Sequence, residues 1–152
     1  MSGQLARLIS RDSILYPLVG DTKDDLLATL TDFLAKRYAL ETDTDRILGR
    51  VLKREAQFST GIGRGIAIPH AEIGEVREPR LVVGFHPGGA DFDSVDDEPV
   101  FLVFLLVFSP ENSEDRLAIL SEISQLLRNF ALLEELRDAK NADELVKILT
   151  EK

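Results

Sequence analysis

Residues 100–108, VFLVFLLVF, form an unbroken apolar run without a single polar side chain. Successive side chains of a strand point to opposite faces of its sheet, so a strand of this composition needs apolar cover on both faces. The run is rich in β-branched and aromatic residues, and it is far shorter than the roughly 20 apolar residues of a membrane helix. We therefore predict a central strand, and this strand limits the chain to folds that cover both faces of a sheet.

Helical periodicity predicts two helices before this run and three after it. Leucines at helical spacing form one face over residues 22–38, and apolar residues repeat the pattern in a second helix behind a cap at residues 42–44. The later helices are expected after Pro110, around residues 132–136, and from Asn141 through Leu149. The helix after Pro110 carries its apolar stripe at Leu117, Leu120, Ile123 (or Ser124) and Leu127.

Two further strands are expected beside the apolar run. Residues 80–85 (RLVVGF) have the composition of a strand, and residues 65–68 (GIAI) form a shorter strand that Pro69 ends. Residues 86–99 are predicted to be a turn-rich connection. The order of helices, strands and helices predicts a single α/β sandwich domain over residues 1–152, with a small mixed β-sheet flanked by helices on both faces.

The composition restricts the possible partners. With a net charge of −9, the chain lacks the surplus of Lys and Arg that neutralises nucleic-acid phosphates, so we expect no nucleic acid among its partners. No segment suits direct membrane insertion, and the N-terminal residues lack the pattern of a signal peptide. The absence of cysteine suits a reducing compartment. We expect a cytoplasmic protein whose partners are proteins or small molecules.

The glycine-rich stretch at residues 59–70, STGIGRGIAIPH, invites comparison with nucleotide-binding loops. A dinucleotide fingerprint needs G-x-G-x-x-G between a strand and a helix, but here the third glycine comes one residue early and a helix precedes the stretch. A P-loop needs a lysine after its last glycine, and none follows Gly65. The remaining interpretation of the glycines is a tight loop that permits positive φ and close packing.

His70 gives the same stretch a second possible role. It follows the proline that ends an apolar strand, and strand ends are common places for chemistry in α/β proteins. A neutral imidazole can accept a phosphoryl group reversibly if arginines or backbone N–H groups bind the phosphoryl oxygens. Arg54 and the amides of residues 59–65 could supply such donors. A lone histidine is also commonly a hydrogen-bonded turn residue, which is our interpretation of His86 in GFHPGG.

Three segments around His70 share a resemblance to a known family. Arg54-Glu55, STGIG at residues 59–63 and GIAIPH at residues 65–70 closely resemble the signature of enzyme IIA of the fructose/mannitol type. This family belongs to the bacterial phosphoenolpyruvate-dependent phosphotransferase system and includes the nitrogen-regulatory IIA proteins. The likeness extends along nearly the whole chain, and it implies an α/β sandwich with a mixed central sheet.

The resemblance also implies roles for individual residues. His70 matches the histidine that is phosphorylated in the family, and Arg54 matches the arginine that lies by it and helps hold the phosphoryl group. The residues that match the wall of the same site are Ser59, Thr60, Gly61, Gly63 and Gly65. The implied partners are a histidine phosphocarrier protein as donor, and a IIB domain or a regulatory target protein as recipient. We expect no metal and no cofactor.

One position departs from the family's pattern. Many members carry a second histidine at the start of the RLAILSEI helix, facing the first, where this chain has Arg116. Arginine binds phosphate through a fork of donors, so we favour Arg116 as a phosphoryl clamp. The alternatives are an arginine that faces solvent, or a copy of the family that transfers phosphate less readily.

The sequence leaves three functions open. We favour a regulatory phosphoryl carrier of the nitrogen type, because the chain has the length typical of that branch and contains no cysteine-bearing IIB domain or membrane domain. The alternative is a stand-alone fructose/mannitol-type IIA component that passes phosphate to a IIB domain during sugar uptake. A binding module of the same shape that is not phosphorylated is a lesser alternative, which rests on Arg116.

Overall fold

The computed structural model describes residues 3–151, so Met1, Ser2 and Lys152, at the ends of the predicted domain, lie outside these residues. Its α-helices are α1 (Gln4–Leu8), α2 (Lys23–Arg37), α3 (Thr44–Gln57), α4 (Ser113–Gln125), α5 (Phe130–Arg137) and α6 (Ala142–Glu151). Its strands are β1 (Ile14–Leu15), β2 (Gly61–Gly63), β3 (Ile66–Ala67), β4 (His70–Glu72), β5 (Arg80–Ala90) and β6 (Val100–Phe108).

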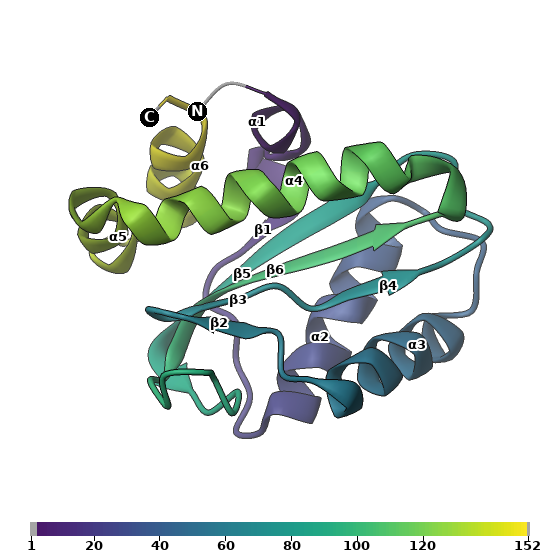
Figure 1. Cartoon of the computed structure of the whole chain (residues 1–152), viewed down its shortest axis with the longest axis horizontal. Coiled ribbons are helices and arrows are strands. Elements are labelled where there is room, and N and C mark those ends of the chain that lie inside the picture. The colour runs from purple at the N-terminus through teal and green to yellow at the C-terminus, as the bar shows by residue number, and fades with distance from the viewer. Residues whose placement is uncertain (1–2, 152) are drawn as a thin grey trace.

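The strands form one mixed sheet between two layers of helices (Figure 1). The strand order is β1-β5-β6-β3-β2, and β4 also pairs with β6. α1, α4, α5 and α6 cover one face of the sheet, whereas α2 and α3 cover the other. This arrangement confirms the predicted sandwich with helices on both faces. Within residues 3–151, no helix is long and apolar enough to cross a membrane.

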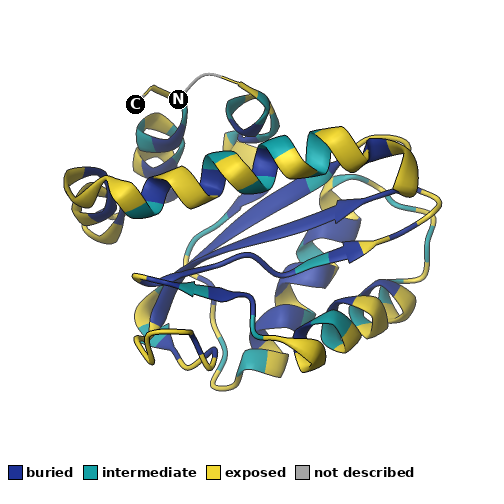
Figure 2. Cartoon of the chain, in the orientation of Figure 1, coloured by how far each residue is buried: buried dark blue, intermediate teal, exposed yellow. Residues whose placement is uncertain are grey.

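β6 is the central strand that its sequence predicts. All of its residues are buried, and Figure 2 shows the buried colour along its whole length. Leu102 and Phe104 belong to the core under α4, α5 and α6, whereas Val103 and Leu105 belong to the core under α2 and α3. Because full burial of one such side chain contributes about 1.5–3 kcal/mol, this strand is a main source of the stability of both cores.

The starts of three helices follow side-chain caps that the sequence displays. Thr22 Oγ1 accepts the Asp25 N–H at 3.1 Å at the start of α2, and Asp43 Oδ1 accepts the Asp45 N–H at 2.9 Å at the start of α3. Asn141 Oδ1 accepts the Glu144 N–H at 2.9 Å at the start of α6. These bonds satisfy N–H groups that have no partner inside the helix, so the predicted helix starts are confirmed.

The structure corrects the predicted connection after β5. Residues 86–99 were expected to be turns, but β5 continues through Ala90, which pairs with Val100. The register shifts between Phe85 and Ala90, and this irregularity takes up Pro87 and the two glycines that follow it. A bulge allows a strand to continue beyond a proline, which cannot donate a hydrogen bond to the neighbouring strand. Pro87 and the glycines after it therefore do not end β5.

The apolar stripe of α4 also differs from the prediction. Leu117 was expected on the inner face, but its exposed fraction is 59%, and Leu120 and Leu127 are only half-buried. The fully buried stripe runs through Ile119, Ile123 and Leu126, so Ile123 was placed correctly and Leu117 was not, whereas Leu120 and Leu127 are partly buried against the same core. The predicted stripe and the buried stripe both have helical spacing. The packing of α4 on the sheet determines which of the two is buried.

Candidate functional site

β3 and β4 both pair with β6 in parallel, with the same offset between the paired residues. Ile66 pairs with Leu102 and His70 pairs with Leu106, so the two short strands are aligned pieces that residues 68–69 separate. Pro69 has no N–H to donate to the ladder, but its carbonyl accepts the Leu106 N–H at 3.0 Å. His70 is therefore held at a strand end, where β4 begins.

One hydrogen bond fixes the state of the His70 ring. Nδ1 lies 2.8 Å from the carbonyl oxygen of Ile68. A carbonyl oxygen only accepts hydrogen bonds, so Nδ1 carries the proton and Nε2 carries the lone pair of the neutral ring. The ring is half-buried and lies against Phe108, with 6.3 Å between the ring centroids. This arrangement leaves Nε2 as the ring nitrogen with a free lone pair.

His70 lines a surface cavity of about 400 Å³ between α3 and α4. Four cationic side chains surround it, although the whole chain has a net charge of −9. Such a cluster attracts an anionic group to His70. The lining residues are Arg50, Lys53, Arg54, Gln57, His70, Ala71, Glu72, Phe108 and Arg116. The structure therefore brings together His70, Arg54 and Arg116, which are separated in the sequence.

The two arginines are held in different ways. Arg54 Nη1 donates to the Phe58 carbonyl at 3.0 Å, which fixes the guanidinium at the C-terminal end of α3. The Arg116 guanidinium lies over the Phe108 ring, 5.1 Å from its centroid. Arg116 Nε is buried and has no hydrogen-bond partner among the described residues. The face of Phe108 thus supports the Arg116 guanidinium at the cavity.

The surroundings of His70 lower the pKa of its imidazole. Burial is the largest cause, and the positive charges of Arg54 and Arg116 act in the same direction. The hydrogen bond to Ile68 and the negative charge of Glu55 act in the opposite direction, because both favour the charged ring. The pKa therefore lies below the ordinary histidine value of about 6.5, and the ring stays neutral and nucleophilic at neutral pH.

This balance predicts the response of His70 to loss of an arginine. Arg54→Ala and Arg116→Ala should each raise the pKa of His70, because each substitution removes a positive charge that disfavours the imidazolium ion. NMR titration of the imidazole C–H resonances measures the shift, with the His86→Ala protein used to assign the signals. A pKa of His70 that stays the same or falls in both variants would contradict the electrostatic account.

The predicted loop residues lie outside the lining of this cavity. Gly61 lies against Ser94, where a Cβ atom would come within 2.4 Å of Oγ, and Gly65 has φ 87° and lies against Phe101. Gly63 lies against the neighbouring Asp96, Ser59 lines a different pocket, and Thr60 is buried. The glycines thus allow β2 and β3 to pack closely on their neighbours. A direct role of these five residues in phosphoryl binding stays a prediction.

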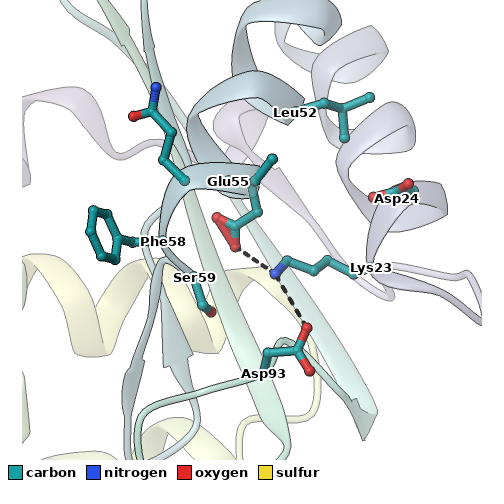
Figure 3. A pocket seen from close by; sticks show the side chains of 9 residues that line it. Lys23, Asp24, Leu52, Glu55, Phe58, Ser59 and Asp93 are labelled. Carbon is teal, nitrogen blue, oxygen red and sulfur yellow. Dashed lines mark ion pairs between the residues drawn. The ribbon is translucent and has the colours of Figure 1, made fainter.

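Glu55 is a buried charge to which the sequence analysis assigned no role. Its exposed fraction is 7%, and its carboxylate pairs with Lys23 Nζ at 3.0 Å in a second pocket (Figure 3). A signal was present in the sequence, because Ile47, Val51 and Glu55 are each four residues apart and share one face of α3. A charged residue on an apolar stripe indicates a buried ion pair or a functional group.

Comparison with known proteins finds one family and relatives of similar length. The family described as "Phosphoenolpyruvate-dependent sugar phosphotransferase system, EIIA 2" matches residues 7–152. A fructose-specific EIIA component from Haloferax volcanii is 35% identical over 130 residues, which cover 86% of this chain and 84% of that protein. A nitrogen regulatory protein from Pseudomonas aeruginosa is 29% identical over 148 residues, which cover 97% and 96% of the two chains.

Longer relatives and solved structures extend the comparison. A fructose-specific EIIABC component from Bacillus subtilis is 30% identical over 148 residues, but the chain spans only 23% of that protein. The nitrogen regulatory protein IIA-Ntr from Neisseria meningitidis has the same fold, with a TM-score of 0.88, 23% identity and coverage of 95% and 98%. The mannitol IIA protein from Escherichia coli, solved in complex with its phosphorylated IIB partner, has a TM-score of 0.77, 20% identity and coverage of 95% and 98%.

Proposed function

The chain belongs to the EIIA 2 family of the phosphoenolpyruvate-dependent sugar phosphotransferase system, and on that premise we propose that it is a phosphoryl carrier. The acceptor atom is Nε2 of His70. The observation that carries this proposal is the hydrogen bond between Nδ1 and the Ile68 carbonyl, because it leaves the lone pair on Nε2 in a ring beside two arginines.

The proposed step exchanges one phosphorus–nitrogen bond for another. The donor is the phosphohistidine of a histidine phosphocarrier protein, which enzyme I charges from phosphoenolpyruvate. The bond from phosphorus to Nε2 of His70 forms while the bond to the donor nitrogen breaks, and the donor ring keeps that electron pair. The His70 ring becomes positively charged, and the Ile68 carbonyl stabilises the Nδ1–H of this ring. Arg54 and Arg116 bind the phosphoryl oxygens.

We favour a regulatory use of this phosphoryl group, in which the charge state of His70 selects a target protein. The relative from Pseudomonas aeruginosa, which is named a nitrogen regulatory protein and aligns over nearly both full chains, supports this reading. The fructose-specific EIIA relative supports the second candidate, transfer to a cysteine of a IIB domain in sugar uptake. We place either exchange in the cytoplasm. A binding module that takes no phosphate is the lesser alternative.

Incubation with enzyme I, a histidine phosphocarrier protein and phosphoenolpyruvate tests the proposal. We expect an acid-labile, base-stable adduct, and ³¹P NMR coupled to the imidazole resonances should place it on Nε2 of His70. A chain that takes no label from a phosphocarrier that is itself charged would overturn the proposal. An adduct on Nδ1 would overturn the assignment of the acceptor atom.

The same reaction separates the two uses of the phosphoryl group. A fructose-type IIB domain added to the labelled protein should remove the label slowly if the chain is a regulator, and rapidly if it is a transport component. Pull-downs with the phosphorylated protein and with His70→Ala should recover different partners from a regulator. Identical partners together with rapid loss of label to the IIB domain would favour transport.

A further inference from the structure

We infer that Lys23 and Glu55 are positioning residues for His70, and that they act through Thr60 and the Ile68 carbonyl. This inference rests on the proposed function, because it explains how the acceptor ring is held for reaction. Neither residue lines the His70 cavity, and both lie in the neighbouring pocket of Figure 3. The last turn of α3 separates the two spaces, since Gln57 lines both of them.

The Glu55 carboxylate has partners on two segments, Thr60 and Lys23. Both of its oxygens lie 3.0 Å from the Thr60 amide nitrogen, and Oε1 also accepts the Thr60 hydroxyl at 3.0 Å. Lys23 Nζ lies 3.0 Å from the same Oε1 and donates to the Phe92 carbonyl at 3.2 Å. The ion pair therefore ties the start of α2 to the end of α3, and it fixes the backbone of Thr60.

A continuous path of hydrogen bonds leads from Thr60 to His70. The Thr60 carbonyl accepts the Ile68 N–H at 2.9 Å, and the Ile68 carbonyl accepts the His70 Nδ1–H at 2.8 Å. Each link joins buried or half-buried groups, which have few other partners to choose. A displacement of Thr60 would therefore reach the one carbonyl that sets the tautomer of His70.

The path has an electrostatic consequence for the reaction. The His70 ring gains positive charge as its bond to phosphorus forms, and the Glu55 charge favours the charged ring. Lys23 pairs with this carboxylate in the neighbouring pocket, and Glu55 does not line the His70 cavity. The arginines and Glu55 therefore have opposite effects on the charge of the ring. The arginines bind the phosphoryl oxygens, and Glu55 supports the ring.

Three substitutions test the network. Glu55→Gln keeps the shape of the side chain but removes its charge, and Lys23→Met keeps the stem but removes the cation. Each should slow phosphorylation of His70 by about 10- to 100-fold, the usual effect of a displacement near a reacting group. Asp93→Asn is the matched control, because Asp93 lies 3.9 Å from Lys23 Nζ, is 83% exposed and should leave the rate unchanged.

A second readout separates positioning from loss of fold. In the unphosphorylated protein, the ¹⁵N shifts of the His70 ring should show one tautomer, with the proton on Nδ1, and both variants should show a mixture of tautomers. Since the two residues act as one unit, the double variant should be no slower than the slower single variant. Variants that keep the wild-type tautomer and rate would overturn the inference, as would slow variants whose ring is unchanged.

The tautomer measurement also separates this inference from the proposed function. It needs no phosphoryl donor, so it reports on the network even if the chain takes no label. A wild-type chain without label but with a tautomer that shifts in Glu55→Gln would refute the carrier function and retain the network. If the chain takes label but neither substitution changes the tautomer or the rate, the network is refuted and the carrier function is retained.

Discussion

A His70→Ala protein is expected to take up no phosphoryl group from a charged phosphocarrier protein, whereas His86→Ala should label like the wild type. Alanine removes the imidazole whose Nε2 lone pair is the proposed acceptor in the cavity between α3 and α4. His86 lies in β5, and its Nε2 contacts the Gly20 carbonyl at 3.2 Å. Its substitution should therefore affect local packing only. Transfer of label from the phosphocarrier, followed on gels at alkaline pH, measures both results.

This comparison is informative only if both variants fold. Circular dichroism and the thermal midpoint provide the control, because His70 is half-buried at a strand end and its removal opens no space in either core. Full labelling of a folded His70→Ala protein would refute the assignment. Loss of label in a folded His86→Ala protein would show that the wrong histidine had been chosen.

The long elements could be predicted because their sequences contain the packing pattern. β6 is apolar throughout, and the helices α2 and α3 show both an apolar face and a capping side chain. Of the short strands, β3 lies within the strand predicted at residues 65–68, whereas β1, β2 and β4 show no such pattern and were not predicted. His70–Glu72 becomes a strand through its pairing with β6, and this pairing is a tertiary contact that the three residues do not encode.

α1 illustrates the same limit at a helix start. The amide groups of Gln4 and Leu5 donate to the carboxylate of Glu122, which lies in α4, 118 residues after Gln4. Helix starts are predictable when the cap is local, as at Thr22, and this cap is not local. No pattern within residues 4–8 could reveal it.

The candidate site could be predicted only in part, because some of its contacts depend on how distant elements pack. The resemblance to a known family pointed to three residues of the site, His70, Arg54 and Arg116. The fold brings these three residues to one cavity. Glu55 stands on the apolar stripe of α3, so its burial could have been anticipated from spacing. Its partner Lys23 could not, because the ion pair depends on how α2 packs against α3.

Arg116→Ala should slow the acceptance of phosphate by His70 and shorten the life of the phosphohistidine, without unfolding the domain. Loss of one charged donor to a developing phosphoryl charge costs about 2–4 kcal/mol, which corresponds to roughly 30- to 1000-fold in rate. Rapid-mixing measurements of transfer in both directions provide the rates. Arg54→Ala should have an effect of the same size, because its guanidinium lines the same cavity.

Two further substitutions separate a clamp from a general effect of charge. Lys53→Ala removes one positive charge from the same cavity, but Lys53 is exposed, so water should screen most of its effect. Arg116→His introduces the side chain that many members of the family carry at this position, and it should retain most of the wild-type rate. Equal losses in Arg116→Ala and Lys53→Ala would indicate a general field effect and no clamp.

The position of Arg116 is itself an argument for the clamp. A cation near the N-terminus of α4 is disfavoured by the helix dipole, and its buried Nε has no hydrogen-bond partner among the described residues. Neither feature stabilises the fold, so the arginine is better explained by an anion that it binds. If Arg116→Ala transfers phosphate like the wild type in both directions, this explanation fails and Arg116 is a surface arginine. If the variant gains thermal stability while it loses rate, the arginine serves phosphoryl transfer at the expense of the fold.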